Sequence, residues 1–148
     1  MKRFFIILSF VALVSVGVFY LSNNNSKPKT PVVNRHEISL KQISSNVAGG
    51  SLLIDVRTAK EYKADHAEGS VNLPLESIEK GKVPTVAKDK IIYVYCHSGK
   101  RASQAKAILE QTGYNNVINI TSLYNWVAMG GKVTGTNPTC SVDDVASC

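Results

Sequence analysis

The most informative stretch of the chain is Ile91-Ile92-Tyr93-Val94-Tyr95-Cys96-His97-Ser98-Gly99-Lys100-Arg101-Ala102. Its apolar first half is typical of a buried strand, and the pattern that begins at Ala102 is typical of a helix. A strand that ends in a cysteine and leads through a short loop into a helix start surrounds the thiol with backbone N–H groups. Such surroundings stabilise a thiolate and hold an anion beside it. The stretch therefore predicts that Cys96 is the nucleophile of an enzyme.

Similar strand and helix patterns alternate along the rest of the chain. Strands are predicted at residues 52–56, 70–74, 91–95 and 117–120, and helices at residues 40–48, 59–62, 76–79, 102–112 and 123–129. This alternation predicts an α/β domain with a mostly parallel central sheet flanked by helices. Ligand sites of such sheets lie beyond the carboxyl ends of the strands, which is where Cys96 falls.

Two of the predicted helices carry a start signal. Ser39 stands directly before the first helical pattern, and serine is a preferred N-cap residue. Thr58 stands before the second, and Glu61 follows it at the spacing of a capping box.

The N-terminal segment predicts export and a membrane anchor. Lys2 and Arg3 precede an uncharged run, residues 4–21, which as a helix would span about 27 Å, close to the thickness of a bilayer core. The positive flank orients the N-terminus toward the cytoplasm, so the rest of the chain would face the periplasm or the outside. A cleaved signal peptide needs small residues at its end, and Phe19-Tyr20-Leu21 are bulky, which favours an uncleaved anchor. We therefore expect residues 1–25 to be a signal-anchor or, alternatively, a signal peptide.

Residues 26–35 are polar and contain prolines, which predicts a flexible linker. The whole chain has 17 Lys and Arg against 11 Asp and Glu, a net charge of +6. Without residues 1–25, 15 cations remain against 11 anions, and they are scattered, so solvated side chains explain them better than a dedicated anionic partner. The sequence shows no basic stripe with interleaved aromatic residues, so nucleic-acid binding is not predicted.

Three features of the loop after Cys96 favour its ionised form. The loop N–H groups converge on the sulfur, the following helix directs its positive end toward it, and Lys100 and Arg101 add charge. Gly99 lets the backbone turn where a Cβ would clash. His97 is a candidate proton donor or base, although neighbours in a tight loop usually point apart. The alternative is that Cys96 is a buried, unreactive packing residue.

These residues resemble the rhodanese family, whose motifs occur here in the family order. Asp55-Val56-Arg57-Thr58 with Glu61-Tyr62 looks like the first motif, and His66-Ala67-Glu68-Gly69-Ser70-Val71-Asn72-Leu73-Pro74 looks like the second. Tyr95-Cys96 with Ser98-Gly99 and Arg101-Ala102 resembles the active-site loop. Gly113-Tyr114, Asn116-Val117 and Trp126 with Gly130-Gly131 are similar to the tail. The resemblance predicts a rhodanese-like domain over residues 36–134, with Asp65-His66-Ala67 in place of the usual Gly-His-Ile.

The resemblance implies a thiosulfate-type sulfurtransferase. Cys96 would take a sulfane sulfur from a small anionic donor such as thiosulfate, form a persulfide, and pass the sulfur to cyanide or a thiol. Donor binding would fall to the loop residues His97, Ser98, Gly99, Lys100 and Arg101. The resemblance implies no cofactor and no metal, and it leaves the protein partner unknown.

Two residue roles and two other functions stay open at this point. Asp55 and Arg57 are carried over by the resemblance as supporting residues near the site, or they form a structural ion pair or a strand cap. The main alternative function is a persulfide-carrying or redox-relay module with little turnover of small molecules. A phosphatase of related fold is disfavoured, because the loop between Cys96 and Arg101 is one residue shorter than in related phosphatases.

Residues 135–148 form a polar tail beyond the resemblance, and they hold Cys140 and Cys148. In an exported protein, a cysteine pair at this spacing predicts a disulfide. The alternative is that one of the two resolves a persulfide or disulfide at Cys96.

Overall fold

The computed structural model of the chain describes residues 38–138. The chain divides into two units, Met1–His36 and Glu37–Cys148, and all described residues belong to the second. The predicted anchor at residues 4–21 therefore lies outside the described residues. Between residues 38 and 138, no helix combines the length and the apolar character that crossing a membrane requires. The predicted linker at residues 26–35 and the tail cysteines Cys140 and Cys148 also lie outside the described residues.

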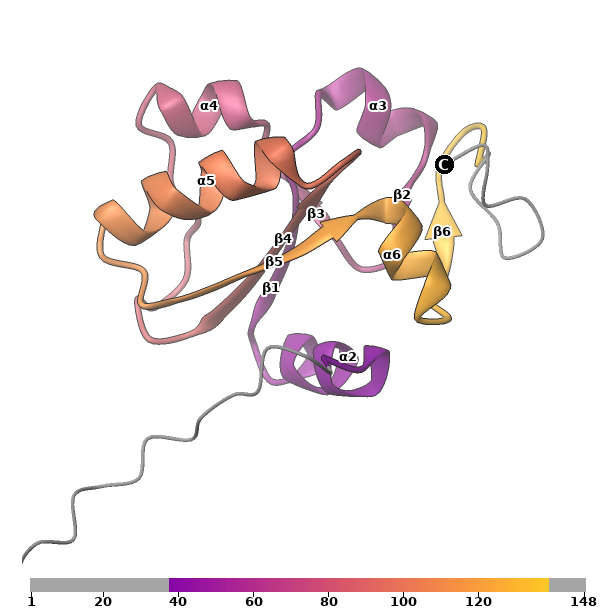
Figure 1. Cartoon of the computed structure of the whole chain (residues 1–148), viewed down its shortest axis with the longest axis horizontal. Coiled ribbons are helices and arrows are strands. Elements are labelled where there is room, and N and C mark those ends of the chain that lie inside the picture. The colour runs from indigo at the N-terminus through magenta and orange to yellow at the C-terminus, as the bar shows by residue number, and fades with distance from the viewer. Residues whose placement is uncertain (1–37, 139–148) are drawn as a thin grey trace, which may run out of the picture. The chain divides into compact units, whose positions relative to one another are not determined.

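Four parallel strands form the central sheet of the domain (Figure 1). Their order is β3-β1-β4-β5, so β4 lies in the interior with a neighbour on each side. The strands are β1 (Leu52–Asp55), β3 (Val71–Asn72), β4 (Ile91–Cys96) and β5 (Asn116–Ser122). Two further short strands, β2 (His66–Ala67) and β6 (Val133–Thr134), pair antiparallel in a small second sheet.

Helices cover both faces of the sheet, as Figure 1 shows. Helices α4 (Leu75–Glu79) and α5 (Lys100–Gln111) pack against one face, and α2 (Leu40–Ala48) and α6 (Leu123–Ala128) pack against the other. Helix α3 (Ala59–Ala64) follows β1 and leads into β2. The α/β fold with a parallel sheet between helices is confirmed.

Successive residues of β4 point to opposite faces of the sheet, as a strand requires. Val94 and Cys96 belong to the core shared with α4 and α5. Tyr93 and Tyr95 belong to the core shared with α2 and α6. The candidate nucleophile and the residue before it therefore lie on different sides of the sheet.

Both capping predictions are confirmed. The Ser39 side chain accepts from the backbone N–H of Gln42 at the start of α2. Thr58 and Glu61 form the reciprocal pair of a capping box at the start of α3. Helix α5 begins at Lys100, two residues before the predicted start at Ala102, because the loop closes earlier than the apolar pattern indicates.

Candidate active site

Cys96 is the last residue of β4 and lies at the carboxyl end of an interior strand. The residue is 1% exposed. The backbone N–H of Gly99 donates a hydrogen bond to its Sγ atom at 3.1 Å. Gly99 is also the N-cap of α5 and has φ 86°, a left-handed conformation that glycine adopts without strain. No side chain caps this helix, so its first N–H groups remain available to the sulfur and to an anion beside it.

The other residues of the predicted donor-binding loop differ in exposure. His97 and Ser98 are exposed, whereas Gly99 is buried. Lys100 is the exposed first residue of α5, and Arg101 follows it in a half-buried position. The structure therefore brings the five loop residues together around the carboxyl end of β4.

Arg101 does not point into solvent, because Glu61 of α3 binds its guanidinium. The two Nη atoms of Arg101 donate to the two carboxylate oxygens of Glu61 at 2.8 and 2.7 Å. Glu61 Oε2 also accepts from the backbone N–H and the hydroxyl of Thr58. These hydrogen bonds, with that of Arg101 the strongest, lower the pKa of Glu61 from 4.5 to about 2. Glu61 raises the pKa of Arg101 in turn, and the Cys96 sulfur adds to this shift.

Replacing Glu61 with glutamine is expected to flatten the dependence of stability on pH in acid. A carboxyl group whose pKa is lowered by folding stabilises the protein above its unfolded pKa, and this stabilisation is lost as the pH falls through the folded value. As the pH falls from about 4.5 to about 2, the melting temperature of the wild type should therefore decrease more steeply than that of Glu61→Gln. Glutamine is accepted in a capping box, so the start of α3 should remain intact.

Thermal unfolding measured across this pH range tests the expectation. Glu79→Gln is a matched control, because Glu79 is exposed on α4 and has no ion pair among residues 38–138. Parallel pH profiles of the wild type and Glu61→Gln would show that the Glu61–Arg101 pair does not contribute to folding.

Asp55 and Arg57 lie in a buried ion cluster on the face of the sheet opposite Cys96. Asp55 is paired in register with Tyr95 and is 0% exposed. The Arg57 guanidinium donates to both carboxylate oxygens of Asp55 at 2.8–3.1 Å. It also stands 5.9 Å from the centre of the Tyr95 ring. This placement favours the structural ion pair over a supporting role at the sulfur.

Asp65 completes this cluster, so its appearance in place of the family's usual glycine has a structural use. Its carboxylate accepts from Arg57 Nη1 at 3.0 Å, and its backbone carbonyl accepts from Nη2. Burial disfavours the charge of Arg57, but the hydrogen bonds and charge of Asp55, together with Asp65, outweigh it and raise the Arg57 pKa.

Tyr95 connects the same cluster to β2 and to the turn that follows it. Its hydroxyl accepts from the backbone N–H of Ala67 and is bonded to Ser70 Oγ, both at 3.0 Å. Burial, followed by the charge of Asp55, raises the pKa of Tyr95. The tyrosine is therefore a neutral hydrogen-bonding anchor and is not placed to act on Cys96.

Three polar residues beside the loop were not predicted as site residues. Asn119 of β5 and Ser103 of α5 bind the carbonyl oxygen of Gly99, and Thr121 packs against Gly99 from β5. The sequence gives only a weak signal for two of them. Asn119 lies in the predicted strand at residues 117–120 and Thr121 directly follows it, and ligand sites of parallel sheets lie beyond the carboxyl ends of strands.

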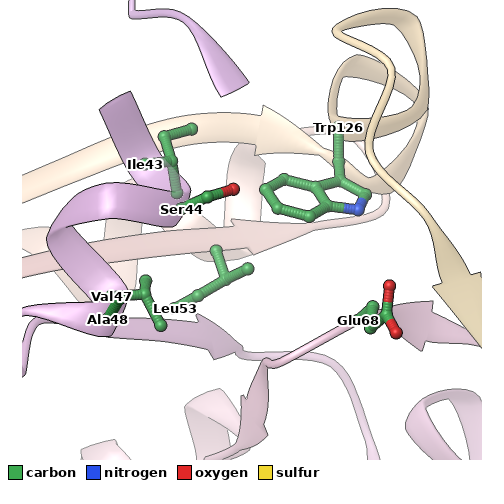
Figure 2. Close-up of a pocket in the computed structure, with 7 residues that line it drawn as sticks. All are labelled: Ile43, Ser44, Val47, Ala48, Leu53, Glu68 and Trp126. Atoms are coloured by element: carbon green, nitrogen blue, oxygen red, sulfur yellow. The ribbon is translucent and has the colours of Figure 1, made fainter. Parts of the chain in front are cut away.

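An apolar groove of about 270 Å³ lies away from the thiol, on the α2 and α6 face (Figure 2). Leu53 and Trp126 line it, and both belong to the core opposite Cys96. In Figure 2 the side chains of α2 stand along one side of this groove, and Glu68 stands near its edge. Among residues 38–138, no cluster of His, Cys, Asp and Glu side chains could hold a metal ion.

Comparisons with known proteins point to one family. The model of the family described as "Rhodanese-like domain" matches residues 39–128. The chain is 39% identical over 72 residues to the thiosulfate sulfurtransferase PspE of Escherichia coli, covering 47% of this chain and 68% of that protein. It is 35% identical over 86 residues to the putative sulfur carrier protein YrkF of Bacillus subtilis, covering 57% of this chain and 46% of that protein. Among solved structures, the rhodanese-like domain of Alr3790 from Anabaena is similar with a TM-score of 0.52 and 28% identity, over 56% of this chain and 97% of that one.

Proposed function

The chain belongs to the rhodanese-like domain family, and on this premise we propose that it is a sulfurtransferase that acts through a persulfide at Cys96. Relatives named as a thiosulfate sulfurtransferase and as a putative sulfur carrier support a reaction of sulfane sulfur. The observation that carries the proposal is the hydrogen bond from the Gly99 N–H to Cys96 Sγ at the uncapped start of α5.

In the first half-reaction, the Cys96 thiolate attacks the outer sulfur of thiosulfate. A bond forms between Sγ and that sulfur, the sulfur–sulfur bond of thiosulfate breaks, and sulfite leaves with the electron pair. In the second half-reaction, cyanide or a thiolate attacks the outer sulfur of the persulfide and restores the Cys96 thiolate. The first half-reaction leaves the negative charge on the outer sulfur of the persulfide, and the second returns it to Sγ. The Gly99 N–H stabilises the charge on Sγ, and the positive end of α5 favours both anions.

The surroundings of Cys96 favour a small anionic donor. The residue is 1% exposed, which disfavours bulky donors. Glu61 already compensates the charge of Arg101, whereas Lys100 is exposed and lies at the helix start. In this proposal Lys100 attracts the anion and the backbone N–H groups bind it.

Exposure of the purified full chain to thiosulfate tests the proposal. The wild type is expected to gain the mass of one sulfur atom on the peptide that contains Cys96, and added cyanide should remove it as thiocyanate. Steady turnover with cyanide should show the parallel-line kinetics of a ping-pong reaction. A chain that stays unloaded at any thiosulfate concentration would reject the proposal.

The alternative, a persulfide carrier with little small-molecule turnover, is favoured by the similarity to a putative sulfur carrier protein. The same experiment separates the two functions, because a carrier would be loaded once and release thiocyanate slowly.

We also propose that the chain is exported and held at the membrane by residues 4–21. This proposal rests on the charge and hydropathy pattern of that segment.

A further inference from the structure

The carboxyl end of β5 carries a distortion that the proposed reaction does not explain. Val94 of β4 pairs with Asn119, and Cys96 pairs with Ser122, so β5 holds one residue more than β4 in this interval. An extra residue of this kind is a β-bulge, which re-aims side chains and is frequent beside active sites. Thr121 lies in the bulge with φ 76°, a left-handed conformation that a β-branched residue rarely adopts. Such strained residues persist where the surrounding structure holds them, and they concentrate at functional sites.

Asn119 holds Thr121 in this conformation. Its side-chain oxygen accepts from the backbone N–H of Thr121 at 2.7 Å. Its side-chain nitrogen donates to Ser103 Oγ at 2.8 Å and to the carbonyl oxygen of Gly99 at 3.2 Å. Because one end of the amide meets a donor and the other meets acceptors, only one orientation of the amide satisfies all these hydrogen bonds.

The same contacts hold Gly99 by its carbonyl oxygen, which lies in the peptide between Gly99 and Lys100. Its carbonyl oxygen also accepts from the backbone N–H of Ser103 at 2.9 Å and from Ser103 Oγ at 3.0 Å. The methyl group of Thr121 stands only 2.8 Å from the position that a Cβ at residue 99 would occupy, so it closes the space above the glycine. The N–H on the other side of the same Cα atom donates to Cys96 Sγ, so a shift of the held carbonyl would turn this N–H.

We propose that Asn119 is a positioning residue for Cys96, acting through what we call the Asn119 clamp: its hydrogen bonds to Thr121, Ser103 and Gly99. The clamp keeps the Gly99 N–H directed at Sγ and so stabilises the thiolate. Its part in sulfur transfer rests on the proposed function, whereas its effect on the thiolate does not. Asn119 does not itself touch the sulfur or the donor.

Alkylation of Cys96 in Asn119→Ala tests the clamp without any sulfur donor. Neutral iodoacetamide is added to the full chain, and the modified Cys96 peptide is quantified by mass spectrometry. At about pH 6 the rate should fall about tenfold or more, as expected for one weakened charge-assisted hydrogen bond to the thiolate. At about pH 10, where an unperturbed cysteine is ionised, the rate should match the wild type.

Asn116→Ala is a matched control. Asn116 is another asparagine of β5 that donates to a backbone carbonyl, that of Asp89, at 2.7 Å. It is the first residue of β5 and pairs with Ile91, at the end of β4 away from Cys96. Its removal should leave the alkylation of Cys96 unchanged at both pH values, and a loss equal to that of Asn119→Ala would overturn the proposal.

A second variant separates the effect of the Asn119 hydrogen bonds to Gly99 and Ser103 from the effect of backbone strain at Thr121. Glycine adopts the left-handed conformation without support, so Thr121→Gly should keep the bulge even when Asn119 is absent. The double variant Asn119→Ala with Thr121→Gly should therefore stay as slow as Asn119→Ala, because Gly99 still lacks the amide donor. Recovery of the wild-type rate would show that the hydrogen bonds of Asn119 to Ser103 and Gly99 do not direct the Gly99 N–H, which overturns the proposal that the clamp acts on Gly99.

The alkylation and sulfur-loading experiments together distinguish a failure of the clamp from a failure of the proposed function. If Asn119→Ala alkylates like the wild type at both pH values, or is slowed equally at both, the clamp is rejected. If the wild type takes no sulfur from thiosulfate while Asn119→Ala shows the loss at low pH alone, the proposed function fails and the clamp stands.

Discussion

Cys96→Ser is expected to take no sulfur from thiosulfate and to lose turnover with cyanide by more than about a thousandfold, the scale of losses seen when an enzyme nucleophile is removed. A hydroxyl is not ionised at neutral pH and forms no persulfide. Serine is close to cysteine in shape, and its oxygen can accept the same hydrogen bond from the Gly99 N–H. The loss should therefore come from chemistry and not from unfolding.

The other two cysteines supply the control for this variant. Cys140→Ser and Cys148→Ser should each still gain the mass of one sulfur atom at Cys96. Circular dichroism and the melting temperature of Cys96→Ser should match the wild type. Persistence of the added sulfur in Cys96→Ser would assign the nucleophile to another residue.

Asp55→Ala is expected to lower the free energy of unfolding by about 3–5 kcal/mol, the usual cost of removing one partner of a buried ion pair. Asp55 is 0% exposed, and Arg57, which is 4% exposed, would keep a buried charge with Asp65 as its remaining carboxylate. A domain of this size is typically stable by about 5–15 kcal/mol, so the variant should be near the limit of folding at 37 °C. Urea unfolding measures the change.

Two comparisons test whether the loss of stability comes from the burial of the ion pair and whether it is independent of Cys96. Glu76→Ala removes the exposed pair with Lys80 on α4 and should change stability little. The folded fraction of Asp55→Ala should still be loaded by thiosulfate, because the ion cluster lies on the face opposite Cys96. A folded variant that no longer accepts sulfur would instead give Asp55 a supporting role in the reaction.

The position of Cys96 was accessible from the sequence because it depends on local patterns. A strand period, a glycine-containing loop and a helix period follow one another within residues 91–112, and the parallel-sheet rule then places the cysteine at a carboxyl end. The sequence pattern predicts the start of α5 at Ala102, two residues later than the structure shows. The N-cap is Gly99, which has no capping side chain that would mark the true start. Strands β2 and β6 have two residues each, too few to show a period.

The Asp55–Arg57 pair was one of the two roles that the sequence left open, but the partners of Arg101 and Asp65 were not accessible from local patterns. Arg101 and Glu61 are 40 residues apart, and no local pattern says that α3 and α5 meet. Asp65 reaches Arg57 only because the chain turns after α3. The left-handed backbone of Thr121 could not be predicted either. A β-branched residue favours an extended conformation, and the hydrogen bond with Asn119 that supports the left-handed one depends on the tertiary fold.

Because side chains alternate along β4, the candidate nucleophile and the buried ion cluster lie on opposite faces of the central sheet. Cys96 and its loop belong to one side, and Tyr95 with the Asp55–Arg57–Asp65 cluster belongs to the other. Changes on separate sides that share no partner should combine additively, since coupling is confined to groups in contact. Replacing the whole ion cluster with apolar residues is therefore expected to raise the melting temperature and to leave the reactivity of Cys96 unchanged.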